Sequence, residues 1–363
     1  MRAIACSLLR GGTSKGVFFD ARELPEDPAH RDRILLSVMG GSDPRQVDGL
    51  GGGDPLTSKV ALVAPSLTPG ADLDYESVEV GLGTAALNRG IMCGNLASAV
   101  PLFALASGML RVAGPVGRLR IHCRSNGKFI VAQRRDGQPW SAVPDGDGTP
   151  AEVGLRFEDP AGAVTGQLLP LGEPLTRLAT AHGEVPVSVV DAGTLYAFVR
   201  ASDLGCAGDE APAALDHDVA LRARVEALRR AAMDRVNRHF GTDHRALRMK
   251  VAMVCALPSG DATADVEVRI LNPARVHKAC AVSGAICLGA AASVPGTVVS
   301  GSSGGAASRG ALRIRHPGGV LSVDMHREGD RLAACEVSRT ARVLMRGTAL
   351  LSDGWPPVAS VPT

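Results

Sequence analysis

Aromatic residues are scarce in this chain. Phenylalanine, tryptophan and tyrosine make up 3% of the 363 residues, whereas all hydrophobic types together make up 45%. The core must therefore consist mainly of Ala, Val and Leu, and the 43 glycines allow many tight turns. A surplus of one charge is missing as well, because 39 basic and 37 acidic residues leave a net charge of +2. This balance argues against a nucleic-acid partner, which requires a basic surface.

Long apolar runs are also missing, and no stretch reaches the roughly 20 residues that a membrane-spanning helix needs. Residues 1–9 contain no signal-peptide cleavage site, and the eight cysteines show neither a CxxC pair nor a regular spacing. Such cysteines are typical of free thiols in a reducing compartment. We therefore expect a cytoplasmic protein without a membrane partner.

Lysine is rare among the basic residues, since it occupies five positions and arginine the other 34. Arginine cannot lose a proton near neutral pH, so the few lysines become candidates for chemistry that arginine cannot perform. Lys128 and Lys250 look like ordinary surface charges. The lysines are Lys15, Lys59, Lys128, Lys250 and Lys278.

The first candidate binding segment is a turn between two short strands, expected at residues 3–9 and 17–19. Its sequence is RGGTSKG, in which Thr13 and Ser14 offer hydroxyl groups and Arg10 and Lys15 offer positive charge. Such a loop can wrap around an anion, although the spacing of a Walker phosphate-binding loop is absent. A helix follows over 31–39, with Asp27 and Pro28 at its start and Gly40 at its end.

A second glycine-rich segment, GLGGGDPLTSK, ends at Lys59. Glycines such as Gly52 let the backbone approach a ligand closely, and Lys59 is the first residue of the strand that follows. A glycine-rich loop alone is usually just a turn. The placement of a rare lysine at its end makes Lys59 a stronger candidate.

Cys93 and Gly94 precede an uncharged stretch that begins at Asn95 and predicts one continuous buried helix. The unpaired N–H groups at the start of such a helix can bind an anion, and a thiol stands beside them. Taken alone, a core helix with a buried cysteine is the simpler interpretation.

The pattern restarts near residue 185, with strands expected at 185–190 and 196–199 and an amphipathic helix at 218–240. Ser283 and Gly284 then open a second uncharged helix, as Cys93 and Gly94 open the first. We interpret this as an internal repeat of two domains, 1–183 and 184–363, whose last strands can cross back to the first domain. Both helix starts are expected to face one cleft. The Gly- and Ser-rich residues 297–311 are expected to form a mobile loop.

These residues suggest a site for a small molecule with two or more carboxylates. A lysine and a cysteine beside it suggest proton transfer at a carbon next to a carboxylate or carbonyl. Lys59 can act as the base only when neutral, so we expect its pKa to be lowered by burial or by Arg10 or Lys15.

At this point the sequence resembles the methylaconitate isomerase (PrpF) family, which includes 4-oxalomesaconate tautomerases and methylitaconate isomerases. The resemblance covers nearly the whole chain. The segments that carry it include RGGTSKGVFF, DPLTSKVALV, MCGN, VTGQLLPLG, VSVVDAG, VHKACAVSGAICL, HPGGVLSVD and SRTARVLMRG. Met92 departs from the usual Asn before the cysteine, which leaves the substrate more open than the chemistry.

The resemblance implies an α/β (α+β) fold of the diaminopimelate epimerase type, with two pseudo-symmetric domains, each a curved sheet or barrel around a central helix. It implies a cofactor-independent isomerase or tautomerase that performs a 1,3-allylic proton transfer or cis–trans isomerisation on an unsaturated di- or tricarboxylate. Lys59 matches the proposed general base, and Cys93 matches a second acid–base group; we expect Lys59 to be essential and Cys93 subordinate. Substrate contacts are expected from Arg10, Thr13, Ser14, Lys15, Gly52, Gly94, Asn95, His277, Ser283 and Gly284.

Two alternatives remain open at this stage. A two-base racemase or epimerase of the same fold usually needs a thiol at both helix starts, and Ser283 occupies the second. A carboxylate-binding accessory protein without activity would bind ligand without exchanging its hydrogen. No metal site is expected, because the histidines lie singly, and His277 can equally be a structural residue. The exact polycarboxylate and the assembly, including a homodimer, stay open.

Overall fold

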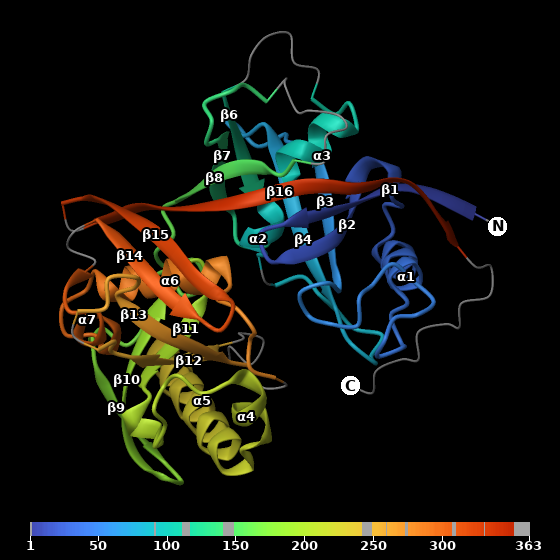
Figure 1. The fold of residues 1–363 in the computed structure, drawn as a ribbon. Coiled ribbons are helices and arrows are strands. Elements are labelled where there is room, and N and C mark those ends of the chain that lie inside the picture. Colours follow the sequence, from blue (N-terminus) through green and yellow to red (C-terminus); the bar gives the residue numbers. More distant parts are fainter. Residues whose placement is uncertain are drawn as a thin grey trace. The chain divides into compact units, whose positions relative to one another are not determined.

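The computed structural model describes residues 2–90, 92–110, 117–140, 149–241, 249–258, 260–272, 275–306, 310–329 and 331–351. The chain divides into two units (Figure 1). Unit 1 comprises Met1–Arg156 and Ser338–Thr363, and unit 2 comprises Phe157–Val337. Each unit is described separately below.

The strands of unit 1 form a closed ring. Among the described residues, eight strands follow each other in the order β1, β2, β3, β4, β6, β7, β8 and β16, and β16 pairs back onto β1. Their bounds are Arg2–Gly11 (β1), Ser14–Asp20 (β2), Lys59–Pro65 (β3), Leu73–Val80 (β4), Arg118–Cys123 (β6), Lys128–Arg134 (β7), Ala151–Glu158 (β8) and Arg331–Leu351 (β16); the short β5, Leu87–Asn88, pairs with β4.

Alternate side chains of the ring's strands point to opposite faces, and each face packs against a different group of residues. The expected first helix is confirmed as α1, Pro28–Met39, with Asp27 accepting a hydrogen bond from the His30 N–H and Gly40 ending the helix in a left-handed conformation. A 3₁₀ turn, Ala21–Glu23, precedes it. Val17 and Phe19 of β2 lie in the hydrophobic cluster that includes α1, whereas Phe18 points the other way and packs against Phe103 with the two rings tilted by 42°.

The expected buried helix after Cys93 is broken into two. These are α2, Gly94–Ala97, and α3, Val100–Ala106. Both are buried, as an uncharged helix should be. The continuity is wrong because Pro101 lies within this stretch, and a helix accepts proline only in its first turn. A new helix therefore begins just before Pro101.

Unit 2 contains a second sheet. Its strands are Thr176–Thr180 (β9), Gly183–Asp191 (β10), Leu195–Arg200 (β11), Lys250–Cys255 (β12), Val266–Leu271 (β13), Ala311–His316 (β14) and Gly319–Glu328 (β15), continued by the first part of β16. Its helices are Ser202–Leu204 (η2), Pro212–His217 (α4), Val219–Phe240 (α5), Val282–Ala292 (α6) and Val298–Ser302 (α7).

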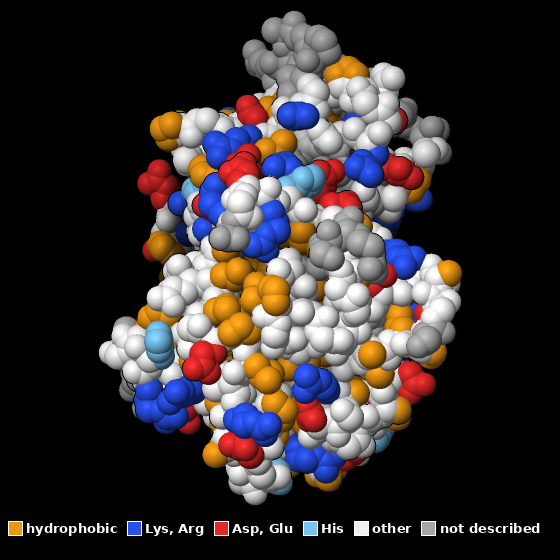
Figure 2. Space-filling view, turned by 90° about the vertical axis from the view of Figure 1, so that its left-hand side faces the viewer, with side chains coloured by type: hydrophobic (Ala, Val, Ile, Leu, Met, Phe, Trp, Pro, Cys, Tyr) orange, Lys and Arg blue, Asp and Glu red, His pale blue; other side chains and the backbone are white. Residues whose placement is uncertain are grey.

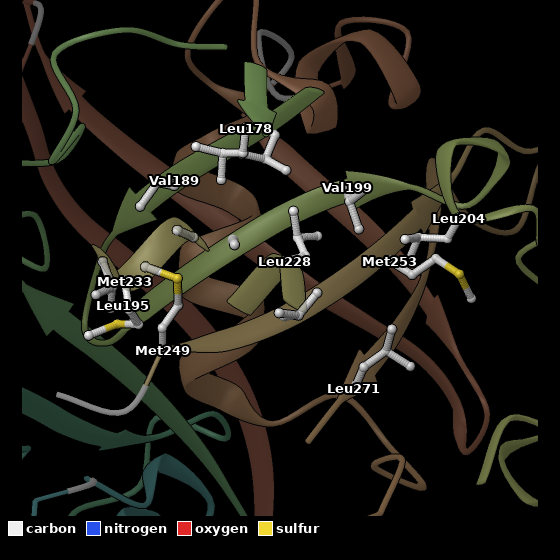
Figure 3. Close-up of a cluster of buried hydrophobic side chains, with 14 of the residues drawn as sticks. Leu178, Val189, Leu195, Val199, Leu204, Leu228, Met233, Met249, Met253 and Leu271 are labelled. Atoms are coloured by element: carbon white, nitrogen blue, oxygen red, sulfur yellow. The ribbon is translucent and has the colours of Figure 1, made fainter. Parts of the chain in front are cut away.

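The long helix α5 covers one face of this sheet. The amphipathic helix expected at 218–240 is confirmed; the Asp218 side chain caps its start, and Gly241 ends it in a left-handed conformation. Figure 3 shows Leu228 and Met233 of α5 in one cluster with Val199 and Met253 of the sheet. The second uncharged helix, α6, is buried along its whole length, and it contacts β10, β11, β14 and β15. This buried helix is confirmed.

The two units repeat one order of strand pairing. In unit 1 the pairs β1–β2, β3–β4 and β6–β7 are antiparallel, and β2–β3 and β4–β6 are parallel. In unit 2 the pairs β10–β11, β12–β13 and β14–β15 are antiparallel, and β11–β12 and β13–β14 are parallel. Helix α1 lies between β2 and β3 in the chain, as α5 lies between β11 and β12. The internal repeat is therefore confirmed.

The division between the units differs from the boundary expected at 183/184. Residues 157–183 belong to unit 2, because the N–H groups of Gly162, Val164 and Thr165 donate to Asp191, and because β9 pairs with β10. At the other end, the chain from Ser338 onward belongs to unit 1.

The expectation of a mobile loop over 297–311 is wrong in its first part. Residues Val298–Ser302 form α7, and the Thr297 hydroxyl caps this helix by accepting from the Ser300 N–H at 3.0 Å. Glycine and serine content therefore did not prevent a short, capped helix. Residues 307–309 lie outside the described part of the chain.

Charges of both signs are mixed on the surface. On the face drawn in Figure 2, basic and acidic side chains alternate with uncharged ones, as the net charge of +2 leads one to expect. Among the described residues, none of the helices combines the length and the apolar character that crossing a membrane requires. The absence of a nucleic-acid partner stays a prediction.

Candidate functional site

Hydrogen bonds from the Arg10 guanidinium hold the turn between β1 and β2 in place. The Arg10 Nη1 donates to the Gly12 carbonyl at 3.0 Å and to the Thr340 Oγ1 at 2.9 Å, and the Gly12 N–H donates to the Thr340 carbonyl at 2.8 Å. Burial and the nearby Arg342 charge lower the pKa of Arg10. The guanidinium of Arg10 therefore shapes the loop that carries Thr13 and Ser14.

Lys59 lies at the start of β3, where the sequence placed it. Its side chain is buried, with 6% of the residue exposed, and the Nζ donates to the Glu79 Oε1 at 2.6 Å. Burial lowers the pKa of Lys59, but the charges of Cys93 and Glu79 raise it by more, so the pKa lies above its usual value. The expected lowering of this pKa is wrong, because the charges of Cys93 and Glu79 together outweigh the effect of burial.

Cys93 is fixed by strand β4. Its N–H donates to the Ser77 Oγ at 2.9 Å, and its carbonyl accepts from the Tyr75 hydroxyl at 2.9 Å. The Cys93 Sγ lies 3.9 Å from the Ser14 Oγ, and the thiol interacts electrostatically with Lys59. Strands β2, β3 and β4 thus bring Ser14, Lys59 and Cys93 together in unit 1.

Asn95 and Thr13 form a second hydrogen-bonded pair of candidate residues in unit 1. Asn95 is 3% exposed; its Nδ2 donates to the Thr13 Oγ1 at 3.1 Å, and its Oδ1 accepts from the Arg339 Nε at 2.9 Å. Gly94, the first residue of α2, is buried between Cys93 and Asn95. Thr13 itself is exposed and can meet a ligand.

The second glycine-rich segment is partly exposed, and local side chains crowd Gly52 within it. A Cβ at Gly52 would lie 2.1 Å from the Thr57 Oγ1, so a glycine is required there for packing. The Gln46 Oε1 accepts from the Ser58 Oγ at 2.6 Å, and the Lys15 N–H donates to the Leu56 carbonyl at 2.9 Å. This segment supports the Lys15 backbone and the approach to Lys59. A contact of Gly52 or the Lys15 side chain with substrate stays a prediction.

In unit 2, Ser283 and Gly284 form the first turn of α6 and are buried. The residue before α6, Ala281, offers no capping side chain, so the first N–H groups of this helix have no side-chain cap. The His277 Nδ1 accepts from the Ala279 N–H at 3.1 Å, which gives the imidazole a structural hydrogen bond. Substrate contacts of Ser283, Gly284 and His277 stay predictions, as does a cleft shared by both helix starts.

Two cysteines of unit 2 lie in or next to α6: Cys287 within the helix, and Cys280 directly before the N-cap residue Ala281. The Cys287 Sγ donates to the Val190 carbonyl at 3.3 Å, and burial raises the pKa of this thiol well above its usual value. The Cys280 thiol donates to the Ala281 carbonyl at 3.5 Å. Cys93 is the N-cap residue of α2, whereas Ala281 is that of α6, so neither thiol occupies the equivalent position in unit 2.

Several residues of the site were missed from the sequence. Glu79 lies in β4, and its place opposite Lys59 follows only from the β3–β4 register. Arg339 lies in the SRTARVLMRG segment, which supported the family resemblance but was given no role. Among the described residues, no group of three or more His, Cys, Asp or Glu side chains is arranged to hold a metal ion.

Comparison with known proteins extends this picture. The family model described as "PrpF protein" matches residues 1–352. The 4-oxalomesaconate tautomerase of Pseudomonas putida is 36% identical over 97% of this chain and 97% of its own length. The 3-methylitaconate isomerase of Eubacterium barkeri is 33% identical over 95% of this chain and 96% of its own length.

Solved structures give the fold. A methylitaconate-delta-isomerase superposes with a TM-score of 0.76 and 30% identity, covering 98% of this chain and 99% of its own. A hydroxyproline epimerase from Agrobacterium vitis superposes with a TM-score of 0.52 and 18% identity, covering 96% and 92%. The epimerase-like α/β fold expected from the sequence is thereby confirmed.

Proposed function

The chain belongs to the PrpF family, and from this premise we propose that it is an isomerase that moves a carbon–carbon double bond in a small unsaturated di- or tricarboxylate by allylic proton transfer. Compounds such as 4-oxalomesaconate, 3-methylitaconate and 2-methylaconitate, named for its relatives, define the substrate class. The same machinery can serve cis–trans isomerisation, because both reactions pass through one delocalised anion.

The observation that carries this proposal is the pairing of Lys59 with Cys93 in the interior of unit 1. Both residues are less than one-tenth exposed, and their charges interact. Two proton-transfer groups of different type, held side by side, suit a reaction in which one carbon loses a proton and another gains one. The hydroxyl groups of Thr13 and Ser14 stand next to them to hold a carboxylate.

The charge state of Lys59 assigns the roles. Because the charges of Cys93 and Glu79 raise the pKa of Lys59, we assign to Lys59 the delivery of a proton rather than its removal. We assign to Cys93 the removal of the proton from the allylic carbon. The resulting anion spreads over the conjugated carboxylate, and Lys59 protonates the distal carbon. Return of the proton from Cys93 to Lys59 restores the starting state, so nothing is consumed.

We propose that the residues around Lys59 and Cys93 bind the substrate and take no part in the proton transfer. We assign Thr13, Ser14 and Asn95 to a substrate carboxylate. Ser283 and Gly284, at the start of α6 where no side chain caps the N–H groups, stay candidates for binding a carboxylate within unit 2. No step of this scheme calls for a metal or an organic cofactor. A reducing, cytoplasmic setting fits the eight cysteines, all of which are free thiols.

The alternatives make different demands. A two-base racemase of this fold would place a second reactive thiol at the start of α6, where Ser283 stands and Cys287 is engaged elsewhere. A non-catalytic carboxylate-binding protein would not need a buried lysine–thiol pair, which is costly to bury.

A screen of unsaturated di- and tricarboxylates in deuterated water tests the proposal. We expect at least one to isomerise, with deuterium entering the allylic carbon as seen by NMR. Ligand binding without deuterium uptake across the panel would favour the accessory protein. Inversion at an sp³ carbon bearing an amino or hydroxyl group would favour the racemase.

A further inference from the structure

Arg339 reaches the site from β16 and meets Asn95 across the first turn. The Arg339 Nε donates to the Asn95 Oδ1 at 2.9 Å, although the two residues are 244 positions apart in the chain. Nothing in the sequence gave Arg339 a role, and the proposed proton transfer does not use it.

The contact fixes the orientation of the Asn95 amide. A guanidinium has only donors, so the oxygen of the amide must face Arg339 and its NH₂ group must face away. The NH₂ group then donates to the Thr13 Oγ1 at 3.1 Å. Within the part of the chain that the structure describes, Asn95 is the hydrogen-bond partner of the Thr13 side chain.

A hydroxyl that accepts from an amide keeps its own hydrogen for another acceptor. Thr13 is exposed, so that acceptor must come from outside the described contacts, and a carboxylate oxygen is the group that binds such a donor most strongly. Without Arg339, the amide could rotate and present its oxygen to Thr13. The hydroxyl would then donate to Asn95 and be lost to the ligand.

The packing around Gly12 shows how tightly this arrangement is held. The residue has a positive φ of 50°, and a Cβ built there would lie 2.4 Å from the Asn95 Oδ1 and 2.7 Å from the Arg339 Cδ. Only glycine leaves room for the amide and the guanidinium to meet over the turn. The turn, α2 and β16 therefore approach one another closely at Gly12.

We propose that Arg339 is a positioning residue, which through Asn95 makes the Thr13 hydroxyl a donor to a substrate carboxylate. This inference rests on the proposed function only in taking the ligand to be a carboxylate. It assigns Arg339 to carboxylate binding, not to the proton transfer between Cys93 and Lys59.

A double-mutant cycle tests the coupling on the substrate found in the screen. We expect Arg339→Met and Thr13→Val each to raise KM about tenfold with little change in kcat, since hydrogen bonds to charged groups have this strength. In the Thr13→Val protein, Arg339→Met should raise KM less than about twofold, because the hydroxyl it orients is gone. Arg339→Lys should recover part of the loss. Arg346→Met, which replaces an exposed arginine of the same strand, is the control and should leave KM unchanged.

Equal tenfold effects of Arg339→Met in both backgrounds would overturn the proposal, because Arg339 would then act on the ligand independently of Thr13. A second measurement needs no substrate. The side-chain amide signal of Asn95 in ¹H–¹⁵N spectra should move in both Arg339→Met and Thr13→Val, and an unmoved signal in either variant contradicts the relay. If the wild-type protein converts no compound in the panel, the proposed function fails, while the amide signal still decides the role of Arg339.

Discussion

Lys59 and Glu79 lie directly opposite each other in the β3–β4 ladder, and the ammonium of one donates to the carboxylate of the other at 2.6 Å. The side chain of Lys59 is 7% exposed and that of Glu79 is 34% exposed. A buried ammonium is therefore paired with a partly exposed carboxylate. This pair sets the charge of Lys59 before any ligand arrives. Two of the predictions below follow from it.

Lys59→Arg should lower the rate of isomerisation by about 10²–10⁴-fold, since arginine keeps the positive charge but cannot deliver a proton. Exchange of the allylic hydrogen in recovered substrate should persist, because Cys93 still removes it. Cys93→Ser should abolish both exchange and isomerisation. The measurement is deuterium uptake into substrate and product, followed separately by NMR. Loss of exchange in Lys59→Arg together with its retention in Cys93→Ser would restore the sequence-based hypothesis that Lys59 is the base.

Glu79→Gln should move the alkaline limb of the kcat/KM profile to lower pH. The Glu79 charge raises the pKa of Lys59, so its removal lets Lys59 lose its proton at a lower pH, and the proton donor is lost earlier. Glu76→Gln is the matched control, because Glu76 lies on the same strand but pairs with Arg89. Higher activity of Glu79→Gln at neutral pH would show that neutral Lys59 is the active form.

Gly12→Ala should destabilise the protein more than Gly127→Ala does. Both glycines have positive φ, of 50° and 67°, so alanine pays the same conformational cost of about 1–2 kcal/mol at each. Only at residue 12 does the new methyl group overlap with neighbours, which typically adds about 1–3 kcal/mol. Urea unfolding measures the difference, and KM should rise only in Gly12→Ala. Equal midpoints for the two variants would contradict this account of the turn.

The buried thiol of Cys123 should make the free energy of unfolding decrease at alkaline pH. Burial raises the pKa of this thiol from 9.0 to about 12. Between these values the unfolded chain has lost the proton and the folded chain retains it, so stability falls as pH rises, by about 1.4 kcal/mol per pH unit for one group. Urea unfolding of Cys123→Ala should therefore depend less on pH above 9 than that of the wild type. Parallel curves would refute the assignment.

Dialysis against a strong chelator should leave turnover unchanged, because the proposed proton transfer needs no metal. The comparison is activity before and after dialysis, with zinc, magnesium and manganese added back one at a time. Activity that is lost and then restored by a single metal would contradict the scheme.

Local features of the chain were readable from the sequence. The cap at Asp27, the stop at Gly40 and the turn after Arg10 each depend on residues a few positions apart, and each is confirmed. The break between α2 and α3 was readable too, since Pro101 stands in plain sight within the apolar stretch. The sequence-based prediction of one helix relied on the uniform hydrophobicity of this stretch and gave too little weight to the proline.

Long-range contacts of the site were not readable. Arg339 contacts Asn95, and β16 pairs with β1, although most of the chain lies between these partners in the sequence. The sign of the Lys59 pKa shift depends on Glu79, whose position is set by strand register. Lys250 illustrates the same limit: it begins β12 as Lys59 begins β3, an equivalence that the fold alone makes visible.

The path of β16 has a consequence for synthesis of the chain. Its first part pairs with β15, whereas its later part supplies the strand that closes the ring on β1. Unit 2 is one continuous segment, but unit 1 needs the two ends of the polypeptide. On the ribosome, therefore, the domain whose translation starts first is the last to be completed. The edge of β1 stays without its partner strand until the final residues emerge.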